Sequence, residues 1–231
     1  IAPKRYVRNF KAWDMERQLL LLKGAIALVG LGGLGGGLLE LLARVGVGRI
    51  LAADGDVFEQ SNCNRQLLCT TDTLGQPKSL AAEARVRNIN PGVVCQCHHE
   101  ILDEPGMLEL IRQAGDKAIV VDALGGLESR PALWRAARKA GRPMVTAAVA
   151  GGSGCMGSFF PDQAGPELLF APASSQGNAA EDVLGTQGPG VHLAACLQAQ
   201  EVVRLLQHPE TQEGRVLFFD LNDLTFERVR L

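Results

Sequence analysis

The sequence predicts an α/β fold: a Rossmann-like, doubly wound and mostly parallel sheet that ends in antiparallel strands. First, aliphatic runs typical of buried strands alternate with helical segments over residues 25–148. Second, a glycine cluster at residues 30–37 joins the first run to the first helix. Third, the chain closes on two extended segments around a turn at residues 221–224. The alternation implies right-handed crossovers and parallel strands, whereas the closing hairpin is antiparallel.

The first half of the chain supplies three strands and three helices. The fully apolar run AIALV at residues 25–29 is typical of a buried strand, and Gly46 and Gly48 end the helix that follows it. A turn of Asn, Pro and Gly at residues 90–92 ends a second helix. Strands are therefore predicted at residues 25–29, 49–53 and 93–97, and helices at 34–45, 78–90 and 105–113.

The second half continues this alternation and then changes character. The run KAIVVD at residues 117–122 predicts another buried strand. Residues 151–190 are rich in Gly, Ser, Pro and Gln, which predicts a strand followed by a long loop. The other predicted strands cover residues 143–148, 156–160, 216–220 and 225–231, and the other predicted helices cover 130–140 and 191–206. Because no internal repeat or clear linker is visible, we expect residues 1–231 to form a single domain.

The charge balance and the hydropathy pattern exclude several classes of partner. The chain carries 23 Lys and Arg against 25 Asp and Glu, for a formal net charge of −2. This excludes a general polyanion-binding surface, so we expect no nucleic-acid partner. No uncharged apolar run approaches the ~18 residues that cross a bilayer, and the first residues lack the apolar stretch of a secretory signal. We therefore expect a cytoplasmic protein without a membrane partner.

The six cysteines favour a reduced protein over a zinc protein. None belongs to a Cys-x-x-Cys pair, so we expect no zinc site. Residues 93–97 alternate in the manner of a strand, which would turn the thiols of Cys95 and Cys97 to one face as small core groups. Cys196 lies inside the predicted helix over residues 191–206, where we expect it to be a buried packing residue.

The glycine cluster predicts a nucleotide site. Residues 30–35 (GLGGLG) match G-x-G-x-x-G, follow a predicted strand and open a predicted helix. Glycines let the backbone approach phosphates, and the helix N-terminus adds N–H donors with a partial positive charge. Asp54 follows the second strand, where a carboxylate can bind ribose hydroxyls. The motif alone leaves open a nicotinamide cofactor, ATP, and a glycine turn that serves only helix packing.

Polar and basic residues beyond the second strand favour a triphosphate. Residues 61–66 read SNCNRQ, and residues 75–78 read GQPK. Attack on an α-phosphate builds negative charge on its oxygens and on the departing pyrophosphate, which Arg65 and Lys78 can stabilise. Hydride transfer has no general need for such residues, so a nicotinamide oxidoreductase is the weakest interpretation.

An ordered set of short motifs spans nearly the whole chain. They are RYVR (5–8), GLGGLG (30–35), GVG (46–48), DGD (54–56), SNCNRQ (61–66), GQPK (75–78), INP (89–91), LQA (197–199) and FD (219–220). Through this set the sequence resembles the ThiF/MoeB/HesA family, the bacterial relatives of ubiquitin-activating enzymes. Members bind ATP and adenylate the C-terminal carboxylate of a small ubiquitin-like protein, often a sulfur carrier ending in Gly-Gly. The resemblance implies that residues 1–231 form one ThiF-type nucleotide-binding adenylation domain.

The resemblance also implies cofactors and residue roles. ATP and Mg²⁺ are the implied cofactors, and the substrate's own carboxylate is the nucleophile, so the enzyme supplies position and countercharge. Arg8 would reach the site from the second subunit of a homodimer and would act with Asn62, Arg65 and Lys78 in catalysis. The implied nucleotide-binding residues are Gly32, Gly33, Asp54, Asp56, Ser61, Asn62, Arg65, Gln66, Lys78 and Asp122.

One departure from the family pattern concerns magnesium. The family places Asp-x-x-Asp-Asn after the fourth strand, and its second Asp serves the metal. Here residues 122–126 read DALGG, so Gly125 occupies that place. Asp122, Asp56 and Glu128 are candidates to compensate, and Asp122 is the predicted Mg²⁺ ligand.

Two further departures concern cysteine. The paired Cys-x-x-Cys motifs common in the family are missing, and ELLF at residues 167–170 stands near the place of the first pair. The loop that often carries a thioester or persulfide cysteine covers residues 177–183 here and has no cysteine. A covalent thiol intermediate is therefore not expected.

The leading hypothesis is ATP-dependent adenylation of a ubiquitin-like sulfur carrier. Gly125 motivates an alternative, a catalytically weakened nucleotide-binding family member that recruits a ubiquitin-like partner. A third hypothesis keeps the family fold but places the carboxylate chemistry on a small molecule or a modified RNA base.

Overall fold

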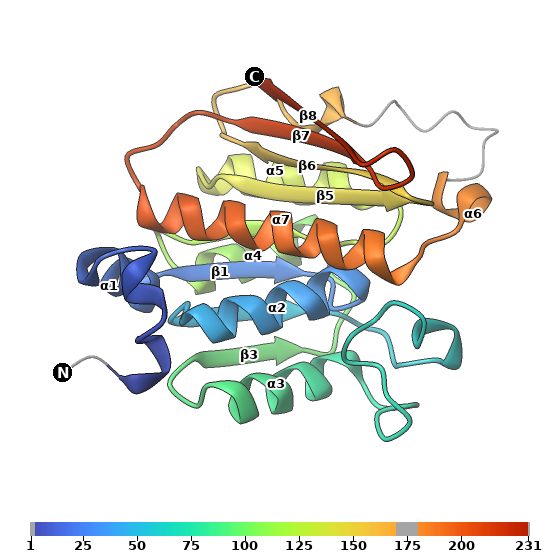
Figure 1. Cartoon of the computed structure of the whole chain (residues 1–231), viewed down its shortest axis with the longest axis horizontal. Coiled ribbons are helices and arrows are strands. Elements are labelled where there is room, and N and C mark those ends of the chain that lie inside the picture. Colours follow the sequence, from blue (N-terminus) through green and yellow to red (C-terminus); the bar gives the residue numbers. More distant parts are fainter. Residues whose placement is uncertain (1–2, 170–179, 231) are drawn as a thin grey trace.

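A computed structural model describes residues 3–169 and 180–230 of the chain. These residues form one eight-stranded sheet with the strand order β3-β2-β1-β4-β5-β6-β7-β8 (Figure 1). The strands are β1 (Ala25–Val29), β2 (Arg49–Ala53), β3 (Val94–His98), β4 (Ile119–Asp122), β5 (Met144–Ala150), β6 (Ser153–Phe159), β7 (Arg215–Asp220) and β8 (Thr225–Arg230). The α-helices are α1 (Met15–Lys23), α2 (Gly33–Val45), α3 (Lys78–Ile89), α4 (Glu104–Ala114), α5 (Arg130–Ala140), α6 (Ala180–Leu184) and α7 (Gly188–Gln207).

The sheet is parallel through its first five strands and antiparallel through the last three. Strands β3, β2, β1, β4 and β5 run in one direction, and β6, β7 and β8 pair antiparallel in sequence order. This confirms the predicted fold class, including the closing hairpin. The predicted strands and helices match the observed ones in order and type, with boundaries that differ by up to three residues.

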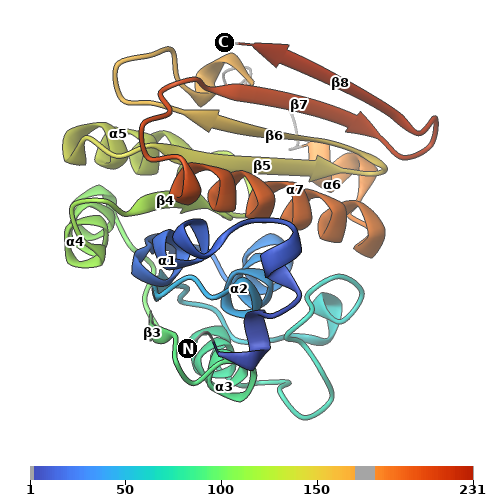
Figure 2. The ribbon, with the colours of Figure 1, turned by 60° about the vertical axis from the view of Figure 1, so that its left-hand side comes forward.

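Helices cover both faces of the sheet, so the central strands are buried on both sides. Helices α1, α2, α3 and α7 pack on one face, and α4 and α5 pack on the other (Figures 1 and 2). Residues of β1 alternate between the two cores: Ile26 and Leu28 join the first, and Ala27 and Val29 the second. This double burial explains why the parallel strands appear in the sequence as continuous aliphatic runs.

The register of the central strands places their carboxyl ends side by side. Val29 of β1 pairs with Ala53 of β2 on one side and with Asp122 of β4 on the other. The chain leaves β3 and returns on the opposite side of β1 to form β4, so the order reverses between β1 and β4. Such a switch point, beyond the carboxyl ends of the strands, is the usual ligand crevice of a doubly wound sheet.

The structure adds two α-helices that the sequence analysis missed: α1 and the short α6, which lies where a long loop was predicted. Helix α1 contains four consecutive leucines, of which Leu21 is buried while Leu19 and Leu20 are exposed, so it lacks a clear 3.6-residue period. The sequence feature that could have indicated α1 is the Asp14 that precedes it. The Asp14 carboxylate accepts a hydrogen bond from the backbone N–H of Arg17 and so acts as the N-cap.

The cysteine predictions had mixed outcomes. Cys95 and Cys97 lie on the same face of β3, partly buried, with their sulfurs 3.6 Å apart, as predicted. Cys196, however, is exposed on α7, and the prediction that it is a buried packing residue is wrong. Helix α7 buries Ala195, which faces Gly37 of α2, and Ala199, and this turns Cys196 to the outside.

Within the described residues, no helix combines the length and the apolar character that crossing a bilayer requires.

Two glycines in the first strand-to-helix connection are required by packing. A Cβ on Gly35 would lie 1.9 Å from the carbonyl oxygen of Gly30, whereas a Cβ on Gly36 would meet the Leu68 side chain at 3.2 Å. We expect Gly35→Ala to destabilise the fold by at least about 3 kcal/mol despite its gain in helix propensity. Gly36→Ala gains the same propensity against a side chain that can move, so it should stay within about 1 kcal/mol of wild type. Denaturant unfolding of both variants measures the difference, and equal stabilities would contradict the packing argument.

Candidate active site

A cavity of about 580 Å³ opens beyond the carboxyl ends of β1, β2 and β4, at the switch point of the sheet. Eight of the predicted site residues line it: Gly32, Gly33, Asp54, Asp56, Asn62, Arg65, Gln66 and Lys78. Three others, Ser61, Asp122 and Arg8, are not among its lining residues. The structure therefore gathers the glycine turn and the basic residues beyond β2 into one site.

The glycine turn forms the floor of the cavity. Gly30 has φ +98°, and a Cβ there would lie 2.3 Å from the carbonyl oxygen of Ala123, which follows β4. This contact presses the turn against the neighbouring strand. Helix α2 begins at Gly33, and its N-cap residue Gly32 offers no side-chain cap. The first N–H groups of α2 are thus left for an anion in the cavity.

Asp54 connects β2 to the glycine turn. Its Oδ2 accepts the backbone N–H of Leu31 at 2.7 Å, and its Oδ1 accepts that of Asp56 at 2.8 Å. Each carboxylate oxygen keeps a second acceptor position, so Asp54 can also receive ribose hydroxyls. The residue predicted from spacing therefore has a structural role, and its remaining acceptor positions are available to a ligand.

Lys78 reaches the cavity because the chain makes a long excursion after β2 and returns to it. An isolated bridge joins Val57 to Pro77, and the backbone N–H of Lys78 donates to the carbonyl of Asp56 at 3.0 Å. The Lys78 ammonium lies 2.8 Å from the carboxylate of Asp56. The Lys78 side chain is 7% exposed and that of Asp56 is 64% exposed. A phosphate entering the cavity can therefore compete with a solvated carboxylate for a buried ammonium.

Asn62 and Arg65 lie on the same excursion of the chain, between β2 and α3. The Arg65 guanidinium donates to the carbonyl of Ser61 at 3.0 Å and to the amide oxygen of Asn64 at 2.8 Å. The Asn62 side-chain oxygen accepts the backbone N–H of Glu59 at 3.1 Å, which caps the 3₁₀ turn Gln60–Asn62. Ser61 thus contributes a carbonyl that orients Arg65 and does not line the cavity.

Gln66 carries an unsatisfied acceptor beside the glycine turn. The residue is 7% exposed, and its Oε1 is buried without a hydrogen-bond partner within the described part of the chain. Its amide lies against Gly32, with Nε2 3.5 Å from the position of a Cβ there. Buried acceptors are normally paired, so this oxygen is an exception beside the glycine turn.

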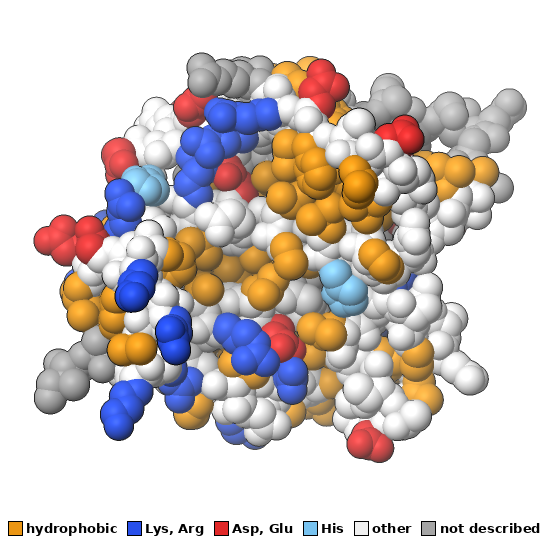
Figure 3. Space-filling view, in the orientation of Figure 1, with side chains coloured by type: hydrophobic (Ala, Val, Ile, Leu, Met, Phe, Trp, Pro, Cys, Tyr) orange, Lys and Arg blue, Asp and Glu red, His pale blue; other side chains and the backbone are white. Residues whose placement is uncertain are grey.

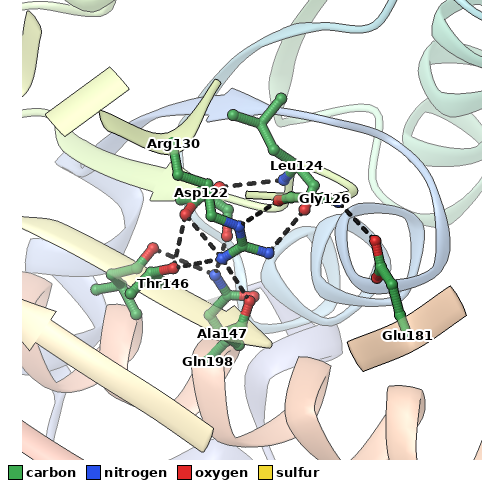
Figure 4. Close-up of polar contacts among 9 residues, drawn as sticks. Asp122, Leu124, Gly126, Arg130, Thr146, Ala147, Glu181 and Gln198 are labelled. Atoms are coloured by element: carbon green, nitrogen blue, oxygen red, sulfur yellow. Dashed lines mark hydrogen bonds and ion pairs between the residues drawn. The ribbon is translucent and has the colours of Figure 1, made fainter. Parts of the chain in front are cut away.

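Asp122, the predicted magnesium ligand, is engaged elsewhere (Figure 4). It is fully buried, and its Oδ2 lies 3.0 Å from the Arg130 guanidinium and 2.6 Å from the Thr146 hydroxyl. Its Oδ1 accepts the backbone N–H of Leu124 at 3.1 Å. With these partners, Asp122 connects β4 to α5 and β5 and lies outside the cavity lining. This geometry does not favour Asp122 as a metal ligand or as a nucleotide contact.

Arg130 is a residue that the sequence analysis read only as part of a helix. Its guanidinium also donates to the backbone carbonyls of Leu124, Gly126 and Ala147, each within 2.9 Å. These bonds fix the loop between β4 and α5, which lines the cavity at Leu124 and at Gly125. The ion pair joins Arg130 to Asp122, the last residue of β4, which lies eight positions earlier in the chain. This spacing is the sequence feature that could have indicated the pair.

Two acidic residues of α6 were also missed. Glu181 and Asp182 line the cavity, and the Glu181 carboxylate accepts the backbone N–H of Gly126 at 2.8 Å (Figure 4). Glu128, which the sequence analysis named as a candidate to compensate for Gly125, is exposed and does not line the cavity. The predicted loop over residues 177–183 lies partly outside the described residues.

Arg8 is held far from the cavity of its own chain. Its neighbour Tyr6 is buried, and the Tyr6 hydroxyl accepts a hydrogen bond from the Asn90 amide at 2.8 Å. Arg5 donates to the carbonyl of Ile89 at 3.0 Å. Helix α3 ends at Ile89, on the side of the sheet where the parallel strands begin (Figure 1). The residues that line the cavity include those that follow the carboxyl ends of β1, β2 and β4.

The buried thiols are not activated nucleophiles. Burial, together with the neighbouring Cys63, raises the pKa of the Cys69 thiol to about 11. Burial also raises the pKa of Cys155. Both thiols are therefore protonated near neutral pH, and neither residue lines the cavity.

Removing Arg130 should destabilise the chain strongly, because the Asp122 charge would stay buried without its partner. We expect Arg130→Met to lower the free energy of unfolding by about 3–5 kcal/mol. Arg142→Ala is the matched control, since it breaks an ion pair with the fully exposed Asp116 and should cost about 1 kcal/mol or less. Denaturant unfolding compares the two, and equal losses would contradict the role of the buried pair.

The chain resembles known proteins over nearly its whole length. It is 36% identical over 219 residues to the SAMP-activating enzyme E1 of Haloferax volcanii, covering 93% of this chain and 79% of that protein. It is 29% identical over 230 residues to the sulfur carrier protein ThiS adenylyltransferase of Escherichia coli, covering 94% and 86%. The bovine adenylyltransferase and sulfurtransferase MOCS3 is 32% identical over 242 residues, and the chain spans 50% of its length.

Solved structures share the fold. The Escherichia coli MccB complex with ATP superposes with a TM-score of 0.81 at 18% identity, covering 99% of this chain and 71% of that one. PaaA superposes with a TM-score of 0.78 at 21% identity, covering 98% and 72%. Residues 4–231 match the ThiF family, and the chain therefore belongs to that family.

Proposed function

We propose that this chain is an ATP-dependent adenylyltransferase that activates the C-terminal carboxylate of a small ubiquitin-like protein of the sulfur-carrier type. One observation carries the proposal: Arg65 and Lys78 line the same cavity as the glycine turn and Asp54. A nucleotide bound to that turn would have its phosphates beside two fixed cations. Family membership and relatives named for adenylating or activating ThiS and SAMP support the same reaction.

The reaction needs charge stabilisation more than it needs a protein nucleophile. A carboxylate oxygen of the substrate attacks the α-phosphorus of ATP, the bond to the β-phosphate oxygen breaks, and pyrophosphate leaves. Negative charge grows on both groups, where Lys78 and Arg65 stabilise it and the α2 N-terminus adds donors. Binding both substrates in one cavity supplies the remaining advantage by orientation.

The acidic lining of the cavity fits a magnesium ion that arrives with the nucleotide. Mg²⁺ is usually held by one or two carboxylates together with substrate phosphates, so it needs no protein cage. The described residues hold no cluster of three or more metal-binding side chains, but Asp56, Glu181 and Asp182 line the cavity as single carboxylates. When bound there, the ion would neutralise phosphate charge as a Lewis acid.

An exposed apolar surface supports a protein substrate. Leu224 is 75% exposed and Phe226 is 54% exposed on the β7–β8 hairpin, and apolar side chains gather over this hairpin in Figure 3. Contiguous apolar surface of this kind is typical of protein–protein contacts. The hypothesis of a small-molecule or RNA-base substrate leaves this surface without a role.

The alternative of a catalytically weakened recruiting protein is not favoured. Its motivation was Gly125, yet the basic residues of the cavity are intact and the relatives are named as adenylyltransferases or activating enzymes. A nicotinamide oxidoreductase would leave Arg65 and Lys78 without a role in the cavity.

The proposal extends to assembly and compartment. Because the N-terminal segment is anchored at the amino edge of the sheet, Arg8 can serve a cavity only on another copy, which favours a homodimer. All six cysteines are free, which favours the reducing cytoplasm, where ATP is also available.

Pyrophosphate exchange tests the reaction. With a Gly-Gly-tailed sulfur carrier present, wild-type protein should incorporate labelled pyrophosphate into ATP, and Arg65→Ala and Lys78→Ala should each lower the rate by about 100-fold or more. Lys139→Ala is the control, since its ammonium pairs with Glu104 outside the cavity and the variant should exchange normally. A carrier that lacks its last two glycines should support no exchange. Exchange that is undiminished in both cavity variants would contradict the proposal.

Mixed subunits test the assignment of Arg8. Arg8→Ala and Lys78→Ala proteins should each be inactive alone, but a mixture of exchanging subunits should recover about a quarter of wild-type activity, because half the dimers contain one complete site. Mixing Arg65→Ala with Lys78→Ala is the control and should recover nothing, since both residues serve the same cavity. The absence of recovery in the first mixture, with hybrid dimers shown by mass spectrometry, would remove the assignment.

A further inference from the structure

We infer that Glu181 of α6 supplies the carboxylate that holds the divalent cation of the nucleotide, at the place that Gly125 leaves without a side chain. This inference rests on the proposed function, since it names a ligand in the same cavity. Glu181 lies 56 positions further along the chain than Gly125.

The geometry places Glu181 beside the empty position. Its Oε1 accepts the backbone N–H of Gly126 at 2.8 Å, so the carboxylate is fixed next to Gly125 (Figure 4). A Cβ on Gly125 would meet no atom within 4 Å, which leaves open space there. Within the described residues nothing donates to Oε2 of Glu181, so this oxygen is left for a ligand.

The other nearby carboxylates are occupied or displaced. Asp122 is buried under Arg130 and Thr146, outside the cavity lining. Asp54 accepts the backbone N–H groups of Leu31 and Asp56, and its remaining acceptor positions serve the ribose in the proposed function. Asp56 forms an ion pair with Lys78. Glu100 also lines the cavity, but it follows β3, whereas Glu181 is hydrogen-bonded to the loop that carries Gly125. Within the described residues, no salt bridge joins Glu181 or its neighbour Asp182 to a cationic side chain.

Charge distribution indicates why a cation belongs between this group and a nucleotide. Arg65 and Lys78 lie on the segment between β2 and α3, whereas Glu181 and Asp182 come from α6. Triphosphate oxygens within a few ångströms of two uncompensated carboxylates would be repelled, unless a divalent ion stands between them. An independent polar feature of the same cavity is Gln66, which lines it, is 7% exposed, and carries an Oε1 without a partner in the described part of the chain.

Glu181→Gln separates the charge of this residue from its bond to the loop. A glutamine oxygen can still accept the Gly126 N–H, so α6 stays attached to the loop while the negative charge is lost. The probe is α,β-methylene ATP, a non-reacting analogue, and calorimetry measures its affinity with Mg²⁺ and with EDTA. Wild-type protein should bind the analogue more tightly with Mg²⁺.

The variant should lose most or all of this preference for Mg²⁺. With Mg²⁺, Glu181→Gln should bind the analogue ~10-fold or more weakly than wild type, by comparison with the loss that follows removal of even an outer-shell partner. With EDTA it should bind as tightly as wild type or more tightly, because a like charge has been removed. Binding of Mn²⁺ in the presence of the analogue, measured by electron paramagnetic resonance, should weaken in parallel.

Gly125→Asp provides the rescue. Its space is open and its backbone is not left-handed, so the double variant Gly125→Asp with Glu181→Gln should regain Mg²⁺-dependent affinity. Glu128→Gln, which removes an exposed carboxylate outside the cavity, is the matched control and should behave as wild type.

Three outcomes overturn the inference. Glu181→Gln could match wild type with Mg²⁺, which would place the ion elsewhere. It could instead bind weakly both with Mg²⁺ and with EDTA, which would reduce Glu181 to a structural contact. A wild-type chain that does not bind the analogue under either condition would overturn the proposed function as well, and this separates the two failures.

Discussion

The close approach of the glycine turn to β4 is the constraint on which the site depends. Gly30 lies so near Ala123 that no side chain fits, and Gly35 brings α2 against the carbonyl of Gly30 in the same way. Asp54 then ties Leu31 to the end of β2. Three strands and one helix N-terminus are thereby fixed around a single point. A nucleotide bound there meets backbone donors whose positions do not depend on flexible side chains.

The opposite wall depends on a buried ion pair. The Arg130 guanidinium fixes the β4–α5 loop, because it donates to the carbonyls of Leu124 and Gly126 in the loop and to that of Ala147 in β5. Asp122 balances the charge of Arg130. Such a pair adds little net stability compared with apolar packing, because both charges lose their water. Its value here is geometric, since it sets the position of Gly125 and of the backbone N–H that holds Glu181.

Much of the fold, and the gathering of the glycine turn with Asp54, Arg65 and Lys78 around one cavity, could be predicted from the sequence for a physical reason. Strands buried on both faces and a glycine turn leave strong local signals, which is why β1, α2 and β2 were found with near-exact bounds. Side-chain direction is not local. Asp122 is the last residue of β4 and Asp54 directly follows β2, yet Asp122 is paired with the buried Arg130 while Asp54 lines the cavity. Cys196 turns outward, because neighbours distant in sequence decide which face of a helix is covered. Helix α1 lacked periodicity, and only its Asp14 cap indicated it.

Glu181 shows why a missing motif residue is weak evidence for a missing activity. A triphosphate requires countercharge at a point in space, and two segments that are distant in the sequence border this cavity: the loop after β4 and the short α6. A carboxylate can therefore leave one segment without loss of function when another segment delivers it to the same point. Motif comparison follows one segment at a time and records Gly125 as a loss. The cavity, which joins both segments, retains an acidic group beside the position where the motif places one.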